Sequence, residues 1–179
     1  MREERSANKA ALSFSTQVKG KKAEKITGTA ILFGLVVLFL VFGRHPIEGS
    51  SMEPTYHDGQ TVYTIRAFIK PEQGDVVVAY SKSLSELLIK RVAAVPGDVV
   101  EITQDGEILI NGEPYLYGVG SALSRRMDAM QETWDGGYRL EVPKGQYFLL
   151  GDNRENSNDS RELGTFGRLS IFEKVLAAR

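Results

Sequence analysis

The feature that most constrains this chain is a run of eighteen residues without a charged side chain, Ile26 to Gly43 (ITGTAILFGLVVLFLVFG). As a helix it would be about 27 Å long, which is at the short end for crossing a bilayer. Leucine, valine and phenylalanine would lie on every side of that helix and leave no polar stripe. We therefore predict a transmembrane anchor over residues 26–43, with a buried core helix as the alternative.

The flanking residues predict that this anchor is retained and how it is oriented. The sequence after it, RHPIEG, lacks a small-x-small cleavage site, and the basic leader is long for a cleavable signal peptide. Residues 1–25 hold seven Lys or Arg and three Glu, a balance of +4, whereas Arg44 is the one basic residue in the next twenty. The positive-inside rule then places a cytoplasmic segment at 1–25 and an extracytoplasmic domain at 44–179, in a single-pass protein of the plasma membrane.

Composition excludes several kinds of chemistry. The chain has no Cys, which removes disulfides, thiolate metal sites and a cysteine nucleophile, and its two histidines, His45 and His57, are too few for a histidine-rich metal centre. We expect no metal and no cofactor. Of the 22 basic and 23 acidic residues, 15 and 20 fall in residues 44–179, a balance of −5. A basic head on an acidic body indicates two environments rather than a nucleic-acid surface.

The outer part is predicted to be mainly β. Seven short runs rich in Val, Ile, Leu and Tyr alternate with Gly-, Pro- and Asp-containing turns: 61–65, 75–80, 87–95, 99–103, 107–111, 138–142 and 146–150. Asp105-Gly106 predicts a hairpin with a tight primed turn. Residues 82–90 could instead open with a helical turn, 117–137 read as a short helix or a mobile insertion, and LSIFEKVLAAR at the end has helix-like spacing.

The sequence does not match three familiar motifs of catalytic and metal sites. The sequence GSSME around Ser51 does not fit the nucleophile elbow G-x-S-x-G. A Ser-His-Asp triad would need His57, which lies in the turn-like sequence YHDG. The acidic stretch 151–164 (GDNRENSNDSRELG) lacks the glycine and the final glutamate of an EF-hand loop.

Lys90 is the remaining candidate base. It stands with Arg91 inside the apolar run LLIKRVAAV, and in a strand the two side chains point to opposite faces. Both could simply extend to the surface. If Lys90 is buried instead, desolvation lowers its pKa, and a neutral amine can take a proton from a serine hydroxyl. A pKa of about 8 would cost roughly 3 kcal/mol of stability.

Four sequence blocks resemble the corresponding blocks of bacterial type I signal peptidases. The blocks are SSMEPT at 50–55, GDVVVAY at 74–80, LLIKRVAAVPGD at 87–98 and GDNRENSNDSRELG at 151–164, in the family's order. Together with the preceding anchor they cover most of residues 26–164. The resemblance implies a membrane-bound serine endopeptidase with a signal-peptidase-like β-barrel or sheet domain, which removes signal peptides after Ala-x-Ala-like sites. It also implies signal peptides of secreted preproteins, the lipid bilayer and the secretion translocon as partners.

The resemblance assigns roles residue by residue. It makes Ser51 the nucleophile, assisted by its own N–H as an oxyanion donor, and Lys90 the general base. Some members have a serine at the position of Gly49, and it donates a second oxyanion bond. The chain resembles the Gram-positive-type short forms, which have glycine there, and a backbone amide could supply that bond instead. The other implied residues are a hydroxyl that orients the lysine (Ser157), a supporting ion pair (Asp159 and Arg161) with two charged neighbours (Asp152 and Arg154), and a substrate pocket (Ile47, Met52, Tyr56 and Ile89).

Three other readings remain open. A non-catalytic relative that acts as a pilus-assembly chaperone would keep the fold but lose the serine or the lysine, and both are present here. A dedicated processing peptidase of a conjugation system would keep the dyad and narrow the substrate range. A membrane-tethered β-rich binding module would hydrolyse no peptide.

Overall fold

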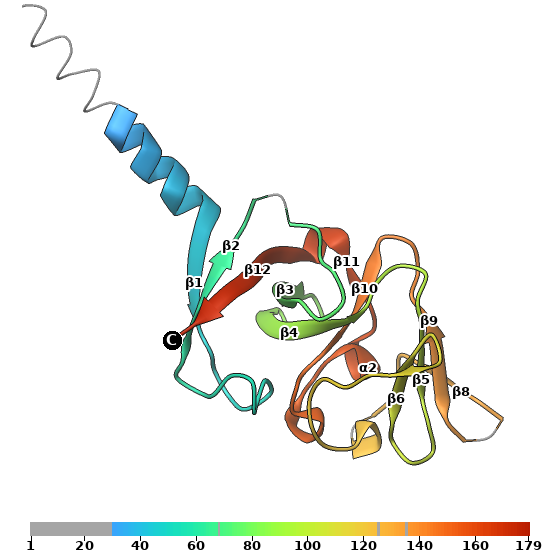
Figure 1. Ribbon diagram of the computed structural model, residues 1–179. Helices are drawn as coiled ribbons and strands as arrows, with labels where there is room; N and C mark the ends of the chain where they lie inside the picture. Colours follow the sequence, from blue (N-terminus) through green and yellow to red (C-terminus); the bar gives the residue numbers. More distant parts are fainter. Residues whose placement is uncertain (1–29, 68, 125, 135) are drawn as a thin grey trace, which may run out of the picture. The chain divides into compact units, whose positions relative to one another are not determined.

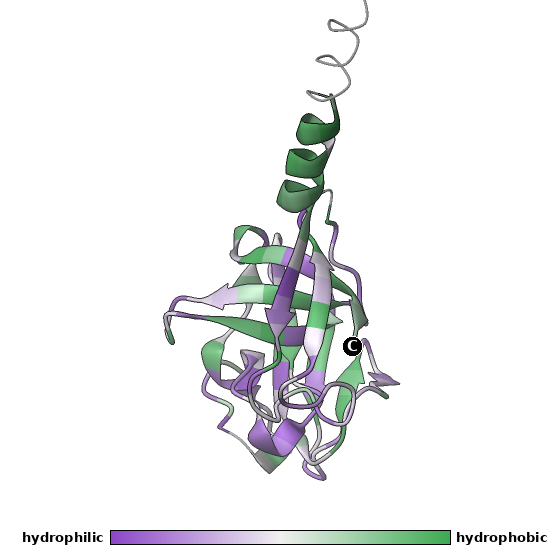
Figure 2. Ribbon diagram, turned by 90° about the vertical axis from the view of Figure 1, so that its left-hand side faces the viewer, coloured by the Kyte–Doolittle hydropathy of each residue, from purple (hydrophilic) through white to green (hydrophobic). Residues whose placement is uncertain are grey.

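The computed structural model describes residues 30–67, 69–124, 126–134 and 136–179, and the chain divides between Val41 and Phe42 into two units. In the first unit, residues 30–41 form a helix whose side chains are almost all apolar (Figure 2). Within the described residues no helix is both long and apolar enough to cross a membrane. The predicted anchor, 26–43, lies partly outside them, since 26–29 are not described. Its last two residues, Phe42 and Gly43, belong to a strand rather than to the helix.

The second unit is mainly β, as predicted (Figure 1). Its described strands form a seven-stranded antiparallel sheet in the order β1 (Phe42–Pro46), β2 (Thr61–Ile65), β12 (Ile171–Ala178), β3 (Val76–Ser81), β4 (Glu86–Ala94), β10 (Gln146–Leu150) and β11 (Phe166–Gly167). A five-stranded antiparallel sheet follows the order β7 (Glu113–Pro114), β6 (Ile108–Ile110), β5 (Val99–Ile102), β9 (Tyr138–Glu141) and β8 (Gln131–Glu132).

Short helical turns lie in the connections. They are the 3₁₀ turns η1 (Ala122–Ser124), η2 (Arg154–Asn156) and η3 (Arg168–Ser170), and one four-residue α-helix, α2 (Ser160–Leu163). All seven predicted strands are present with boundaries within a few residues. The alternative helical turn before Lys90 is a β-hairpin turn instead, since β3 and β4 pair directly from Ser81–Glu86 onward.

Apolar strand faces build three groups of buried side chains. One joins the five-stranded sheet to the far ends of β4 and β10, around Phe148, Leu150 and Ile102. A second lies under β3, β4 and β10, and a third gathers Ile47, Met52, Val62, Val76 and Val175 beside the loop that follows β1. The third group anchors the start of the loop that carries Ser51.

Two local predictions were wrong. The C-terminal segment is strand β12, not a helix, because it fills the position between β2 and β3 and buries alternate residues, Ile171, Glu173 and Val175. Short apolar runs fit both periods, so tertiary pairing decides. The Asp105-Gly106 hairpin exists, but its turn is not primed: Gly106 has positive φ, Asp105 does not, and the Gly106 N–H donates to the Thr103 carbonyl.

Candidate active site

Ser51 lies in the loop between β1 and β2, and the backbone of that loop is closed on itself. The Ile47 N–H donates to the Gln60 carbonyl at 2.7 Å, and the Gly59 N–H donates to the Ile47 carbonyl at 2.9 Å. The Gly49 N–H donates to Asp58 Oδ1 at 2.7 Å, with Gly49 at a φ of +79° that favours glycine. These bonds hold the Gly-Ser-Ser turn in one conformation.

A second loop, residues 151–154, fixes Ser51 from the other side. The Asn153 N–H donates to the Ser51 carbonyl at 3.0 Å. Gly151 lies against the same carbonyl so closely that an added Cβ would stand 2.6 Å from the oxygen and 2.1 Å from Ser157 Oγ. A side chain at position 151 would therefore push the two loops apart.

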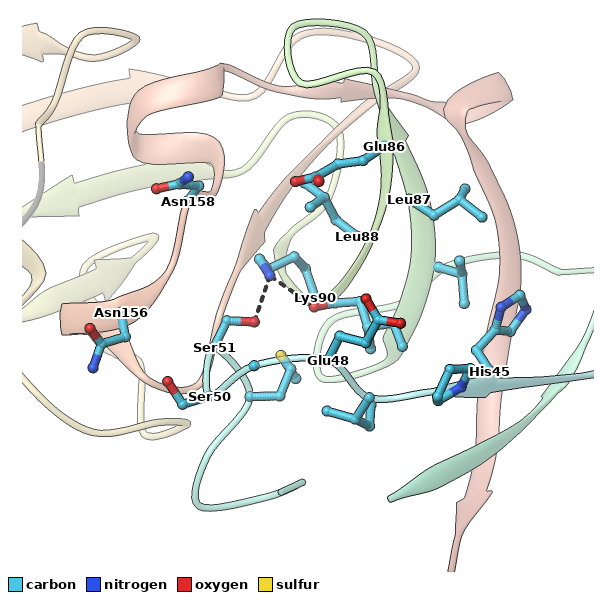
Figure 3. A pocket seen from close by; sticks show the side chains of 16 residues that line it. His45, Glu48, Ser50, Ser51, Glu86, Leu87, Leu88, Lys90, Asn156 and Asn158 are labelled. Carbon is cyan, nitrogen blue, oxygen red and sulfur yellow. Dashed lines mark hydrogen bonds between the residues drawn. The ribbon is translucent and has the colours of Figure 1, made fainter. Parts of the chain in front are cut away.

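Lys90, on β4, reaches Ser51 directly. Its Nζ donates to Ser51 Oγ at 2.8 Å and to the Ile89 carbonyl at 3.1 Å, and the residue is only 3% exposed (Figure 3). Burial lowers the pKa of Lys90 to about 8, although the carboxylates of Asp159, Glu86 and Asp152 act in the opposite direction. The surface-exposed alternative for this lysine is excluded by its burial.

Arg91 points to the other face of β4 and is also buried. Its Nε and Nη2 donate to the two oxygens of Asp152 at 2.8 and 2.6 Å, a bidentate ion pair. Its Nη1 donates to the Gly74 carbonyl at 2.7 Å, and its guanidinium lies 4.7 Å from the centre of the Tyr117 ring. This pair joins β4 to the 151–154 loop that holds Ser51.

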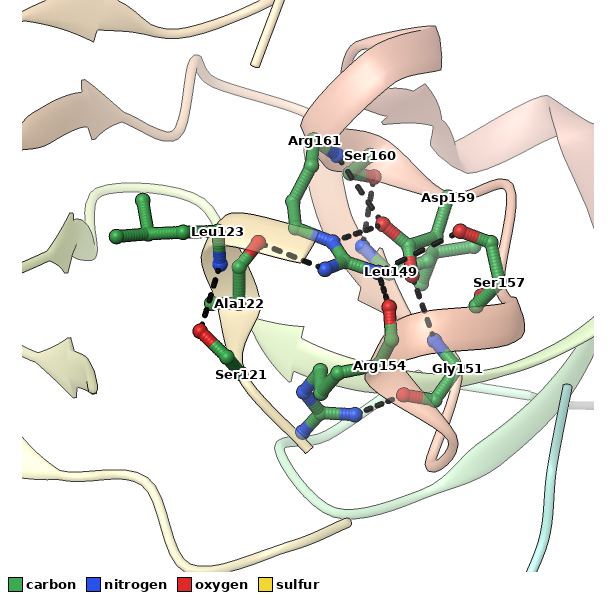
Figure 4. A network of polar contacts seen from close by, with 10 residues as sticks. All are labelled: Ser121, Ala122, Leu123, Leu149, Gly151, Arg154, Ser157, Asp159, Ser160 and Arg161. Atoms are coloured by element: carbon green, nitrogen blue, oxygen red, sulfur yellow. Dashed lines mark hydrogen bonds and ion pairs between the residues drawn. The ribbon is translucent and has the colours of Figure 1, made fainter. Parts of the chain in front are cut away.

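Asp159 and Arg161 form a second buried ion pair, with neither side chain exposed (Figure 4). Arg161 Nε donates to Asp159 Oδ1 at 2.9 Å, while Asp159 Oδ2 accepts the Gly151 N–H at 3.1 Å. The remaining guanidinium nitrogens donate to the carbonyls of Ala122 and Arg154. The pair therefore ties together η1, η2 and the glycine beneath Ser51.

Ser157 differs from its predicted role. Its side chain is buried, and its Oγ forms no hydrogen bond with any described residue, so the expected bond to Lys90 is absent from this structure. The hydroxyl instead lies over Gly151. Arg154, predicted as a charged neighbour, donates from its guanidinium to the carbonyls of Gly151 and Tyr117 and so braces the same loop.

Ser51 and Lys90 line a groove of about 500 Å³. Three of the predicted pocket residues, Ile47, Met52 and Ile89, line it as well, as does Gly49. Tyr56 is not among the residues that line this groove, and it packs against the buried group that contains Met52 and Val62. Its place in a substrate pocket stays a prediction.

Several groove residues were missed from the sequence. Glu86 and Leu88 lie on the same side of β4 as Lys90, and Asn156 and Asn158 come from the acidic stretch (Figure 3). Strand alternation counted back from Lys90 would have found the first two. His45 also lines the groove, and nothing in the sequence indicates this; its Nε2 lies 2.9 Å from the buried carboxylate of Glu173.

Among the described residues, no three His, Asp or Glu side chains are grouped as a metal site.

Comparison with known proteins gives one consistent family. The family model described as "Signal peptidase, peptidase S26" matches residues 21–177. A signal peptidase I of Bacillus licheniformis is 34% identical over 140 residues, which cover 74% of this chain and 73% of the relative. Signal peptidase I S of Bacillus subtilis is 33% identical over 150 residues, 79% of each chain. A crystal structure of a signal peptidase I from Enterococcus faecalis is 26% identical, with a TM-score of 0.45, and covers 62% of this chain and 100% of that one.

Proposed function

Because the chain belongs to the signal peptidase family, peptidase S26, we propose that it removes signal peptides from exported preproteins with Ser51 as nucleophile and Lys90 as general base. The observation that carries the assignment of these two residues is the 2.8 Å contact between Ser51 Oγ and the buried Lys90 amine. The enzyme is a serine peptidase that works without histidine at the reacting atoms.

The proton transfer follows from the low pKa of Lys90. With a pKa of about 8, the amine is neutral in about one molecule in ten at pH 7, against about one in 2,500 for a free lysine. The neutral Nζ takes the Ser51 hydroxyl proton through their existing contact while Oγ attacks the scissile carbonyl carbon. Lys90 then gives that proton to the leaving amine, and an ester remains on Ser51.

Water completes the cycle. Lys90, neutral again, takes a proton from a water molecule that attacks the ester carbonyl, and the proton passes back to Ser51 Oγ as the signal peptide leaves. The Ser51 N–H is the proposed oxyanion donor, since it forms no hydrogen bond with any described residue. The Gly49 N–H is held by Asp58, so in this conformation it does not supply a second bond.

The substrate is proposed to lie in the groove beside the dyad. Ile47, Met52 and Ile89 supply apolar walls there, which suit the small side chains at positions −1 and −3 of an Ala-x-Ala-like site in an extended segment. Tyr56 does not line this groove. The two buried ion pairs, Arg91–Asp152 and Asp159–Arg161, hold the loops on which this geometry depends.

The membrane location is proposed from the sequence. The uncharged run 26–43 anchors the enzyme, the basic segment 1–25 stays in the cytoplasm, and the domain from residue 44 acts outside. Signal peptides are themselves apolar helices, so an anchored enzyme meets them in the plane of the bilayer. The bilayer and the secretion translocon are its proposed partners in that encounter.

The test is cleavage of a preprotein with an Ala-x-Ala site by the full chain in lipid or detergent, from pH 6 to 10. We expect Ser51→Ala and Lys90→Met to lose activity and Ser50→Ala to retain it, with the acidic limb of the wild-type profile near pH 8. Cleavage by Ser51→Ala would exclude this nucleophile. A folded wild-type protein that cuts no preprotein would favour the chaperone reading, and one that cuts a single dedicated substrate would favour the conjugation-type peptidase.

A further inference from the structure

The groove beside the dyad carries two carboxylates, one on each wall. Glu48 lies on the Ser51 loop and Glu86 at the start of β4, and both side chains are exposed. Within the part of the chain that the structure describes, neither carboxylate forms a hydrogen bond or an ion pair. Both are therefore available to a bound substrate.

Nothing else in the groove lining balances these charges. Lys90 is the one lysine or arginine among the lining residues, and it must be neutral to act as a base. His45 is already bonded to Glu173. In its working protonation state the groove is thus a negative channel, which attracts cationic peptide segments and repels anionic ones.

Strand geometry places Glu86 relative to the reacting atoms. Glu86, Leu88 and Lys90 share one face of β4, and Figure 3 shows their side chains on the same side of the strand. Four residues along a strand span about 13 Å, so Glu86 stands about four substrate residues from the scissile bond. The lining residues of β4 all precede or include Lys90, so the groove extends from the dyad toward Glu86.

Ile47 and Ile89, which are proposed to receive positions −1 and −3, line this same groove. A segment before the cleavage site that continues along the groove would run beside β4 toward Glu86, with residue −1 at the dyad and residue −5 beside the carboxylate.

We propose that this enzyme favours preproteins with a lysine or arginine about five residues before the cleavage site, and that Glu86 selects that side chain, with Glu48 adding to the same negative field. The inference rests on the proposed function and names a substrate class for its groove. The contact is partly exposed, so the expected preference is modest, about two- to fivefold in kcat/KM.

The experiment compares preproteins that differ only at position −5, with Lys, Gln or Glu there, using the full-length enzyme in neutral lipid vesicles at pH 9. At that pH Lys90 stays neutral even where a change at Glu86 alters its pKa. The wild type should cleave the Lys substrate about two- to fivefold better than the Gln substrate, and the Glu substrate worse. Glu86→Gln should lower the Lys-to-Gln ratio toward one, leaving only the weaker effect of Glu48, and Glu86→Lys should invert it.

Two controls make the result specific. Glu113→Gln removes an exposed carboxylate from β7, outside the groove, and should leave the ratio unchanged. A substrate with the lysine moved to position +3 should show no gain. Equal ratios in the wild type and Glu86→Gln, or an equal gain from +3, would overturn the inference while cleavage itself continues. No cleavage of any substrate by the wild type would instead refute the proposed function.

Discussion

Replacing Lys90 by Met should stabilise the protein at neutral pH while abolishing its activity. In the unfolded chain the lysine has a pKa of 10.5, and in the folded protein burial lowers it to about 8. At pH 7 the amine is charged in both states, and at about 1.4 kcal/mol per pKa unit the buried charge costs roughly 3 kcal/mol of folding free energy. Methionine has a similar shape and no charge, so this cost disappears.

The pH dependence of the stability difference between Lys90→Met and the wild type shows whether the buried charge causes it. Between pH 8 and 10.5 the unfolded chain binds more protons at this position than the folded protein, so wild-type stability rises with pH across that range. The cost falls from about 3 kcal/mol at pH 7 to about 1 kcal/mol at pH 10. Lost hydrogen bonds to Ser51 and the Ile89 carbonyl offset the gain by about 1 kcal/mol at every pH. The net advantage of Lys90→Met is therefore about 2 kcal/mol at pH 7 and close to zero at pH 10.

Urea unfolding of the full chain in a non-ionic detergent, followed by circular dichroism at pH 7, 8, 9 and 10, measures this difference. The two proteins share every other ionisable group, so the difference between them reports on position 90. Lys144→Met, which removes an exposed lysine, should show no such trend. A Lys90→Met advantage that stays constant from pH 7 to 10, or grows with pH, would refute the argument that burial depresses this pKa.

Two further substitutions test the loops around the dyad. Gly118→Ala should destabilise the protein by about 1–3 kcal/mol more than Gly112→Ala in the same unfolding assay. An added Cβ at 118 would stand 2.5 Å from both Arg154 Nη1 and the Asp152 carbonyl, whereas Gly112 also has a positive φ but open space around it. Equal losses of stability in the two variants would contradict this. Ser157→Ala should change stability by less than about 1 kcal/mol, since the hydroxyl has no partner among the described residues. A large loss of kcat with unchanged stability would show instead that Ser157 turns toward the amine during catalysis.

Strand positions were predictable because their cause is local. The run at 146–150 coincides with β10 and lies between the turn-forming sequences Pro143-Lys144-Gly145 and Gly151-Asp152-Asn153. The run at 61–65 coincides with β2 and begins just after Asp58-Gly59. The last strand was not predictable in the same way. Its apolar residues fit a helix as well as a strand, and only the vacant position between β2 and β3, created by distant parts of the chain, selects the strand.

In the candidate active site, too, some features were predictable from the sequence and others were not. The contact of Ser51 with Lys90 was expected from the resemblance and from the rarity of two basic residues inside an apolar run. The orientation of individual side chains was not accessible, because it depends on rotamers and loop packing. Tyr56 turns toward the buried group below the loop, and Ser157 lies over Gly151, although both stand in the sequence blocks that carry the resemblance.

The structure separates two requirements of a serine–lysine pair and assigns them to different elements. Lys90 is on β4 and pairs with Val77 of β3, so the strand pairing fixes its backbone. Ser51 is on a loop, and its position depends on the Asn153 N–H and on the close approach of Gly151. Loosening that loop should therefore alter the distance between Oγ and Nζ while the backbone of Lys90 stays in place. Changing Glu86 should do the reverse, because its carboxylate acts on the charge of Lys90 rather than on the place of Ser51. Asp159 acts on both, since its carboxylate also accepts the Gly151 N–H beneath Ser51.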